Sequence, residues 1–97
     1  MIKQFFYQPK NSVEGNYNSR GRWMVLCTCN TVDYKKSTAY KWLVANCKGD
    51  WKIDTTMCSM NNGEHLYVMM YDQADAASFS LHYNVQMPAA YELDVAA

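Results

Sequence analysis

Four cysteines and two histidines are the residues of this chain most able to do chemistry, and their spacing fits neither a metal site nor a nucleophile. Zinc is bound by close pairs such as Cys-x-x-Cys, but one residue separates Cys27 from Cys29, and His65 and His82 lie far from both. A reactive thiolate needs exposure and a nearby positive charge, whereas both cysteines fall in an apolar run. We therefore predict buried free thiols, no metal, no cofactor and no enzymatic activity.

Charged residues are sorted along the chain, although the formal net charge is zero. Residues 1–52 hold all nine Lys and Arg against three carboxylates, a formal charge of +6, and residues 53–97 hold six carboxylates and no basic residue, a charge of −6. The field that a partner meets depends on where charges lie on the surface rather than on their sum. The pattern therefore indicates a function in recognition.

Length and composition predict one small domain that spans residues 1–97. A chain of 97 residues can bury one core but is too short for two. Hydrophobic residues make up 49% of the chain and charged residues 19%, as in a folded protein. No stretch resembles a signal peptide or reaches the roughly 20 apolar residues of a membrane helix. We therefore expect a soluble cytoplasmic protein that contacts no membrane.

The first half of the chain predicts two strands separated by a loop, followed by a helix. Residues 2–7 are aromatic and end near a proline, which suits an added edge strand. Asn, Ser, Gly and basic residues over 10–22 predict an exposed basic loop. The near-continuous apolar run 22–30 predicts a central strand. Asp33 is the predicted cap of a helix that ends near Cys47.

The second half predicts a hairpin followed by a second helix. Residues 51–57 alternate apolar and polar, and an Asn-Asn-Gly turn separates them from the apolar run 64–71. Asp72 or Asp75 can then cap a helix that continues to about Asn84. These segments predict two adjacent antiparallel strands and a helix.

Together these elements predict an α+β domain of the ferredoxin-like kind. After the added first strand, the order is β-α-β-β-α-β, with residues 90–95, which alternate apolar and polar, as the last strand. Both helices would cover one face of an antiparallel sheet and leave the other face free for function. The predicted core consists of large apolar residues from every element: Trp23, Val25, Leu26, Leu43, Val44, Ile53, Leu66, Val68, Met70 and Phe79.

The predicted protein-binding site lies on the sheet face that the helices leave open. Aromatic residues and methionine are enriched at protein interfaces, and complementary charge orients docking. The expected hydrophobic anchors are Trp51, Tyr67, Met69 and Tyr71. The expected orienting carboxylates are Asp72, Asp75, Glu92 and Asp94.

Residues 67–83 resemble the strand-then-helix ending of small accessory proteins of tailed bacteriophages. The segment contains an aromatic strand, an acidic helix start with Asp75-Ala76, and then Phe79 and Leu81. This resemblance implies a phage-encoded protein of the host cytoplasm that binds a host or phage protein complex and modulates or inhibits it.

The predicted sheet also resembles RNA-recognition modules, which stack bases on aromatic residues of two central strands. Tyr67 and Tyr71 would share one face, with Trp23 nearby, while Glu64-His65 stands where that family has a basic entry. An alternative function is therefore binding of RNA or single-stranded DNA. The residues expected to serve it are Lys3, Lys10, Tyr17, Arg20 and Arg22.

A third alternative is a self-associating structural protein, because the two oppositely charged halves of separate copies could pair. The sequence leaves open which partner is bound and whether the basic loop orders on binding.

Overall fold

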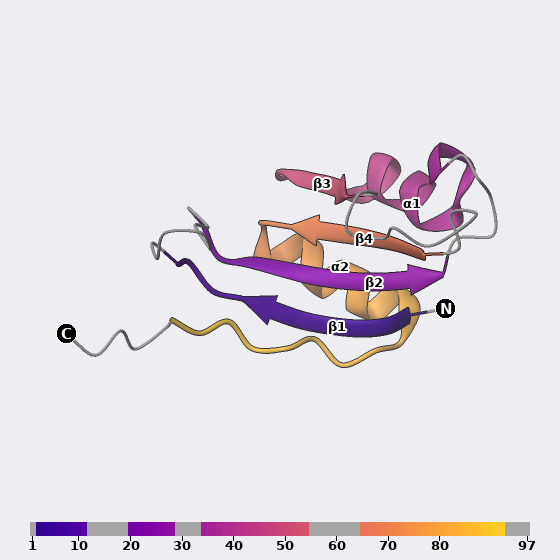
Figure 1. Cartoon of the computed structure of the whole chain (residues 1–97). Helices are drawn as coiled ribbons and strands as arrows, with labels where there is room; N and C mark the ends of the chain where they lie inside the picture. Colours follow the sequence, from indigo (N-terminus) through magenta and orange to yellow (C-terminus); the bar gives the residue numbers. More distant parts are fainter. Residues whose placement is uncertain (1, 12–19, 29–33, 55–64, 93–97) are drawn as a thin grey trace.

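The computed structural model of the chain describes residues 2–11, 20–28, 34–54 and 65–92. Within these ranges the backbone forms strands, two α-helices and one short 3₁₀ helix (Figure 1). Their bounds are β1 Ile2–Gln8, β2 Arg22–Thr28, η1 Tyr34–Lys36, α1 Thr38–Asn46, β3 Trp51–Asp54, β4 His65–Met70 and α2 Gln73–Tyr83.

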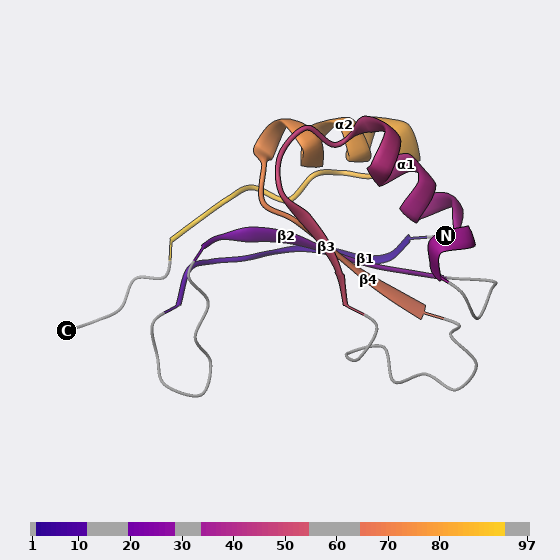
Figure 2. The same ribbon diagram turned by 90° about the horizontal axis from the view of Figure 1, so that it is seen from above.

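The strands form one antiparallel sheet in the order β1-β2-β4-β3. The predicted edge strand and central strand are confirmed, since β1 is an edge and β2 is central. The predicted pairing of the next two strands is confirmed by β3 and β4, whereas the predicted turn 61–63 lies outside the described residues. Both helices lie on one face of the sheet (Figure 2). The α+β class is therefore confirmed, together with the helices on a single face.

The ferredoxin-like arrangement is not confirmed, because the predicted last strand is not observed. Residues 90–92 are not in a strand, and 93–95 lie outside the described residues. The edge of β2 on which the predicted last strand would pair is occupied by β1. The chain after α2 instead runs beside β1 on the helix side (Figures 1 and 2).

Aromatic and indole contacts attach this C-terminal segment to the sheet. Trp23 Nε1 donates a hydrogen bond to the Pro88 carbonyl at 3.0 Å, and the rings of Tyr7 and Tyr91 meet edge to face with centroids 5.5 Å apart. Met87 packs against the core. The segment covers the indole of Trp23, which is 4% exposed, without joining the sheet.

Alternation along the strands directs one set of side chains toward the helices. Three aligned rows cross the sheet on this face, and their pairing is given by the register of β2 with its neighbours. The rows are Tyr7, Trp23, Met70 and Trp51; then Phe5, Val25, Val68 and Ile53; then Ile2, Cys27 and Leu66. These residues form the core with Ala39, Leu43, Ala76 and Phe79 of the helices.

Two residues predicted for the core lie elsewhere. Leu26 is half-buried on the face opposite the helices, because it alternates with Val25 along β2. Val44 is 58% exposed. The predicted helix start at Asp33 is also wrong, since Ser37 caps α1 by accepting the Tyr40 amide at 3.1 Å.

The second helix begins where it was predicted. Asp72 is the N-cap and accepts the amides of Ala74 and Asp75 at 2.8 and 3.3 Å. The helix ends at Tyr83, and Asn84 follows in the left-handed conformation that terminates many helices.

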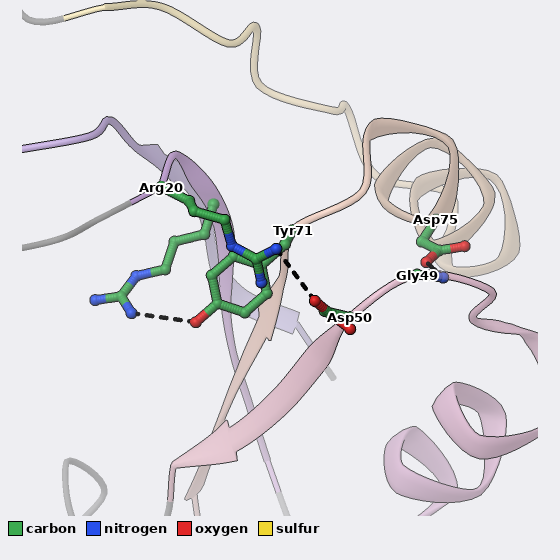
Figure 3. A network of polar contacts seen from close by, with 6 residues as sticks. Arg20, Gly49, Asp50, Tyr71 and Asp75 are labelled. Atoms are coloured by element: carbon green, nitrogen blue, oxygen red, sulfur yellow. Dashed lines mark hydrogen bonds and ion pairs between the residues drawn. The ribbon is translucent and has the colours of Figure 1, made fainter.

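Asp75 joins α2 to the connection between α1 and β3. Its carboxylate is 4% exposed and accepts the backbone amides of Lys48 at 3.0 Å and Gly49 at 2.8 Å (Figure 3). The backbone at Gly49 lies close to the start of α2, since a Cβ on Gly49 would lie 2.7 Å from Cβ of Asp72. Charge-assisted bonds of this kind are stronger than neutral ones. Asp75 therefore stabilises the fold, and its carboxylate is not available to a partner.

We predict that Asp75→Asn lowers the free energy of unfolding by about 1–3 kcal/mol, because one of the two amides would face an NH₂ group instead of an acceptor. Urea unfolding followed by circular dichroism measures the change. Asp72→Asn is the matched control, since it removes one charge from the same helix terminus while Asn remains a good N-cap. Equal midpoints for the two variants would contradict this role of Asp75.

We also predict that a chain ending at Val85 is destabilised by about 1–3 kcal/mol, because the apolar area under Met87 and Tyr91 becomes exposed. The Trp23 indole N–H should exchange faster with solvent, as measured by NMR. A chain ending at Glu92 keeps the Pro88 and Tyr91 contacts and serves as the control. Unchanged exchange in the shorter chain would show that the segment does not shield Trp23.

Candidate arginine–tyrosine binding site

The face of the sheet opposite the helices carries three further rows of side chains. They follow from the same register, because the residues next to each core residue along a strand point to the opposite face. The rows are Gln8, Arg22, Tyr71 and Asp50; then Phe6, Met24, Met69 and Lys52; then Gln4, Leu26, Tyr67 and Asp54.

The centre of this face is shielded from solvent. Met24 is 1% exposed and Met69 is 6% exposed, whereas Phe6 at the sheet edge is 39% exposed. The prediction that Met69 is an exposed anchor is therefore wrong. Tyr67 and Tyr71 are half-buried, so their accessible parts lie around a buried centre.

Trp51 is on the other face, which corrects its predicted place beside Tyr67. It pairs with Met70 and packs on the core, and its ring meets Tyr40 at a centroid distance of 5.6 Å. The run 64–71 is apolar at almost every position, so its pattern alone could not show which residues share a face with Trp51.

The row at one end of this face forms a connected polar network. Arg22 Nε donates to Gln8 Oε1 at 2.7 Å, and Arg22 NH1 lies 3.5 Å from the hydroxyl of Tyr71. The guanidinium of Arg20 lies over the Tyr71 ring, 4.0 Å from its centroid, and pairs with Asp50 at 3.1 Å (Figure 3). We call these five residues the arginine–tyrosine cluster.

Backbone geometry holds the cluster in place. The Tyr71 amide donates to the Asp50 carbonyl at 3.1 Å, which continues the β3–β4 pairing to the cluster. Gly21 separates the two arginines, and a side chain there would collide with the Tyr7 hydroxyl. Because Tyr7 is itself packed on Trp23, with centroids 4.8 Å apart, only glycine allows this close approach without a shift.

Positive charge dominates this end of the sheet. Arg20 is paired with Asp50, but both side chains are well exposed, at 50% and 75%, so the pair is weak. Arg22 contacts only neutral groups among the described residues. Lys52 lies in the next row and is exposed. In these two rows three cations therefore stand with one carboxylate, and Asp54 follows in the third row.

The structure rearranges the sites that the sequence predicted. It brings Arg20 and Arg22, assigned to a nucleic-acid site, against Tyr71, assigned to a protein site. Sequence reasoning missed their partners Gln8 and Asp50, whose only signal was a position opposite Arg22 and Tyr71 in a correctly registered sheet.

Within the described ranges, none of the remaining predicted site residues takes part in the hydrogen bonds, ion pair or cation–π contact of the cluster. Asp75 is buried, which corrects its assignment as an orienting carboxylate, whereas Asp72 caps α2 and is half-buried. Lys3, Lys10 and Glu92 are exposed. Tyr17 and Asp94 lie outside the described residues.

Of the cysteines within the described ranges, Cys27 and Cys47 are in no disulfide. Cys27 is buried in the core, and Cys47, the C-cap of α1, is half-buried. Burial, together with the nearby carboxylates of Asp75 and Asp72, raises the pKa of the Cys47 thiol from 9.0 to about 11. Burial also raises the pKa of Tyr83. Cys47 is therefore a protonated, weakly nucleophilic thiol at neutral pH.

Comparisons with protein-family models, with curated proteins and with solved structures gave no match. In the described part of the chain, no helix is long and apolar enough to cross a membrane. The same residues contain no group of three His, Cys, Asp or Glu side chains placed to hold a metal ion.

We predict that alkylation of Cys47 by iodoacetamide is slow at pH 8 and keeps accelerating up to about pH 11. The unfolded chain ionises first, so the stability contributed by the neutral thiol is complete below pH 9 and lost between pH 9 and about 11. Peptide mass spectrometry measures the rate at Cys47, and the urea-unfolded chain is the reference. A rate that levels off near pH 9 in the folded protein would contradict the raised pKa.

Proposed function

We propose that this protein is a non-catalytic binding module that docks on a protein partner through the sheet face opposite the helices. The observation that carries the proposal is the arginine–tyrosine cluster, which crosses the sheet from Gln8 to Asp50 and fixes two arginines against one tyrosine. Arginine and tyrosine are among the residues that contribute most to binding at protein interfaces.

The cluster is held before any partner arrives. Arg22 is half-buried and bonded to two side chains, and Tyr71 is half-buried beneath Arg20. Ordering a flexible side chain costs about 0.5–1.5 kcal/mol on association. Side chains already ordered on strands avoid much of that cost, which supports this end of the sheet as the centre of the interface.

The resemblance of residues 67–83 to phage accessory proteins supplies the biological setting of the proposal. In that setting the protein acts in the cytoplasm of a bacterial host and modulates or inhibits a host protein complex by occupying its surface. The fold fits a variant of the ferredoxin-like arrangement in which β1 takes the edge beside β2 that the last strand would otherwise occupy.

Binding of RNA or single-stranded DNA is the second candidate, and the grouping of Arg20, Arg22 and Lys52 near Tyr71 favours it. Against it, Arg20 already covers one face of the Tyr71 ring, and Trp23, the other proposed stacking residue, is buried on the helix side. If the protein bound nucleic acid, phosphate contacts would make its affinity for the nucleic acid fall steeply as the salt concentration rises.

Capture from a nuclease-treated bacterial lysate, with matched surface variants, tests the protein-binding function. We expect a protein that is retained by the wild type and reduced about tenfold or more by the double change Arg20→Ala and Tyr71→Ala. The control is Leu81→Ser, because Leu81 is 82% exposed on α2 in the opposite layer. Circular dichroism establishes that each variant is folded.

Two outcomes would overturn the proposal. A protein lost equally from the Leu81→Ser variant would place the interface on the helices. A catch that disappears with nuclease treatment would favour the nucleic-acid function.

A further inference from the structure

The guanidinium of Arg22 is fixed along one edge and has unused donors along the other. Its Nε–H is bonded to Gln8 and one NH1 hydrogen points to the Tyr71 hydroxyl. A guanidinium carries five N–H groups in a planar fork. The remaining donors have no acceptor among the described residues. The side chain is therefore held in one orientation while several of its N–H groups stay available for hydrogen bonds.

The hydroxyl of Tyr71 adds a further donor at the same place. Its oxygen accepts from Arg22, so its own hydrogen is directed elsewhere, and no described residue accepts it. A phenolic oxygen can accept and donate at once. Arg22 and Tyr71 together therefore present donors to one acceptor-only group.

The charge around these donors favours an anion. Among the described residues Arg22 pairs with no carboxylate, and Lys52 lies one row away on the same face. The carboxylate of Asp50 is directed to Arg20 instead. An anion near Arg22 would therefore meet a guanidinium whose described contacts are neutral, with a second cation, Lys52, in the next row.

We propose that Arg22 and Tyr71 form a receptor for a side-chain carboxylate of an acidic segment of a protein partner. The inference rests on the proposed function and names the chemistry of that partner. A carboxylate matches the guanidinium fork with two parallel hydrogen bonds. The Tyr71 hydroxyl donates to one of the same oxygens.

A protein carboxylate fits this site better than a nucleic-acid backbone. Arg20 occupies the ring face of Tyr71 on which a base would stack. A single carboxylate at Arg22 needs neither the removal of Arg20 nor an extended basic track.

Titration of the full-length protein with a fluorescein-labelled oligoglutamate peptide tests the inference. We expect saturable binding that a matching oligoglutamine peptide does not show. In NMR spectra, the Nε–H of Arg22 should shift during the titration. Arg22→Lys keeps the charge but loses the fork, and it should weaken binding by about tenfold.

Controls separate the receptor from general charge attraction. Lys41 is exposed on α1 in the opposite layer, and Lys41→Gln should change affinity by less than about twofold. Tyr71→Phe keeps the ring under Arg20 but removes the donor, and it should weaken binding by about threefold to tenfold. The wild-type NMR shift does not depend on any variant folding correctly.

Three results would overturn the inference. Absence of binding would do so, as would equal losses in Arg22→Lys and Lys41→Gln. Tighter, Arg22-dependent binding of a labelled oligothymidylate would make the site a phosphate receptor instead. If the peptide fails while the lysate capture still depends on Arg20 and Tyr71, the proposed function stands and only the carboxylate receptor falls.

Discussion

The antiparallel register of β2 with β4 is the constraint on which the rest of the structure depends. It places Trp23 opposite Met70 and Val25 opposite Val68, and so assigns every second residue of both central strands to the core. A slip of one residue would exchange the two faces of a strand. The same register aligns Arg22 with Tyr71, so the core and the arginine–tyrosine cluster are two consequences of one pairing.

Sequence patterns predicted where helices and strands lie better than they predicted which side chains each strand directs to the core. The helix α2 was predictable because Asp72 supplies an N-cap and Ala76 and Phe79 recur on one side. The face of β4 was not, because its apolar residues occupy both faces and local alternation is therefore uninformative. The helix start at Ser37 shows the same limit, since a competing cap is decided by the fold, and so is the occupation by β1 of the sheet edge beside β2.

The split of charge along the chain does not become a simple split on the surface. Two carboxylates of the acidic half serve the fold, Asp72 as a helix cap and Asp75 as a buried link to Lys48 and Gly49. The basic half contributes Arg20 and Arg22 to the end of the sheet, where they meet a tyrosine from the acidic half. The arginine–tyrosine cluster arises from this meeting, which composition alone could not indicate.

The bond from Trp23 to the Pro88 carbonyl joins residues 65 positions apart in the sequence. During synthesis the adjacent strands β1 and β2 can pair early, but the central pairing waits for β4 and the cover over Trp23 waits for the last part of the chain. Contacts of such long sequence separation slow folding. The nascent chain must therefore carry an uncovered Trp23 until residues 85–92 have been synthesised, a period in which a chaperone has an apolar surface to bind.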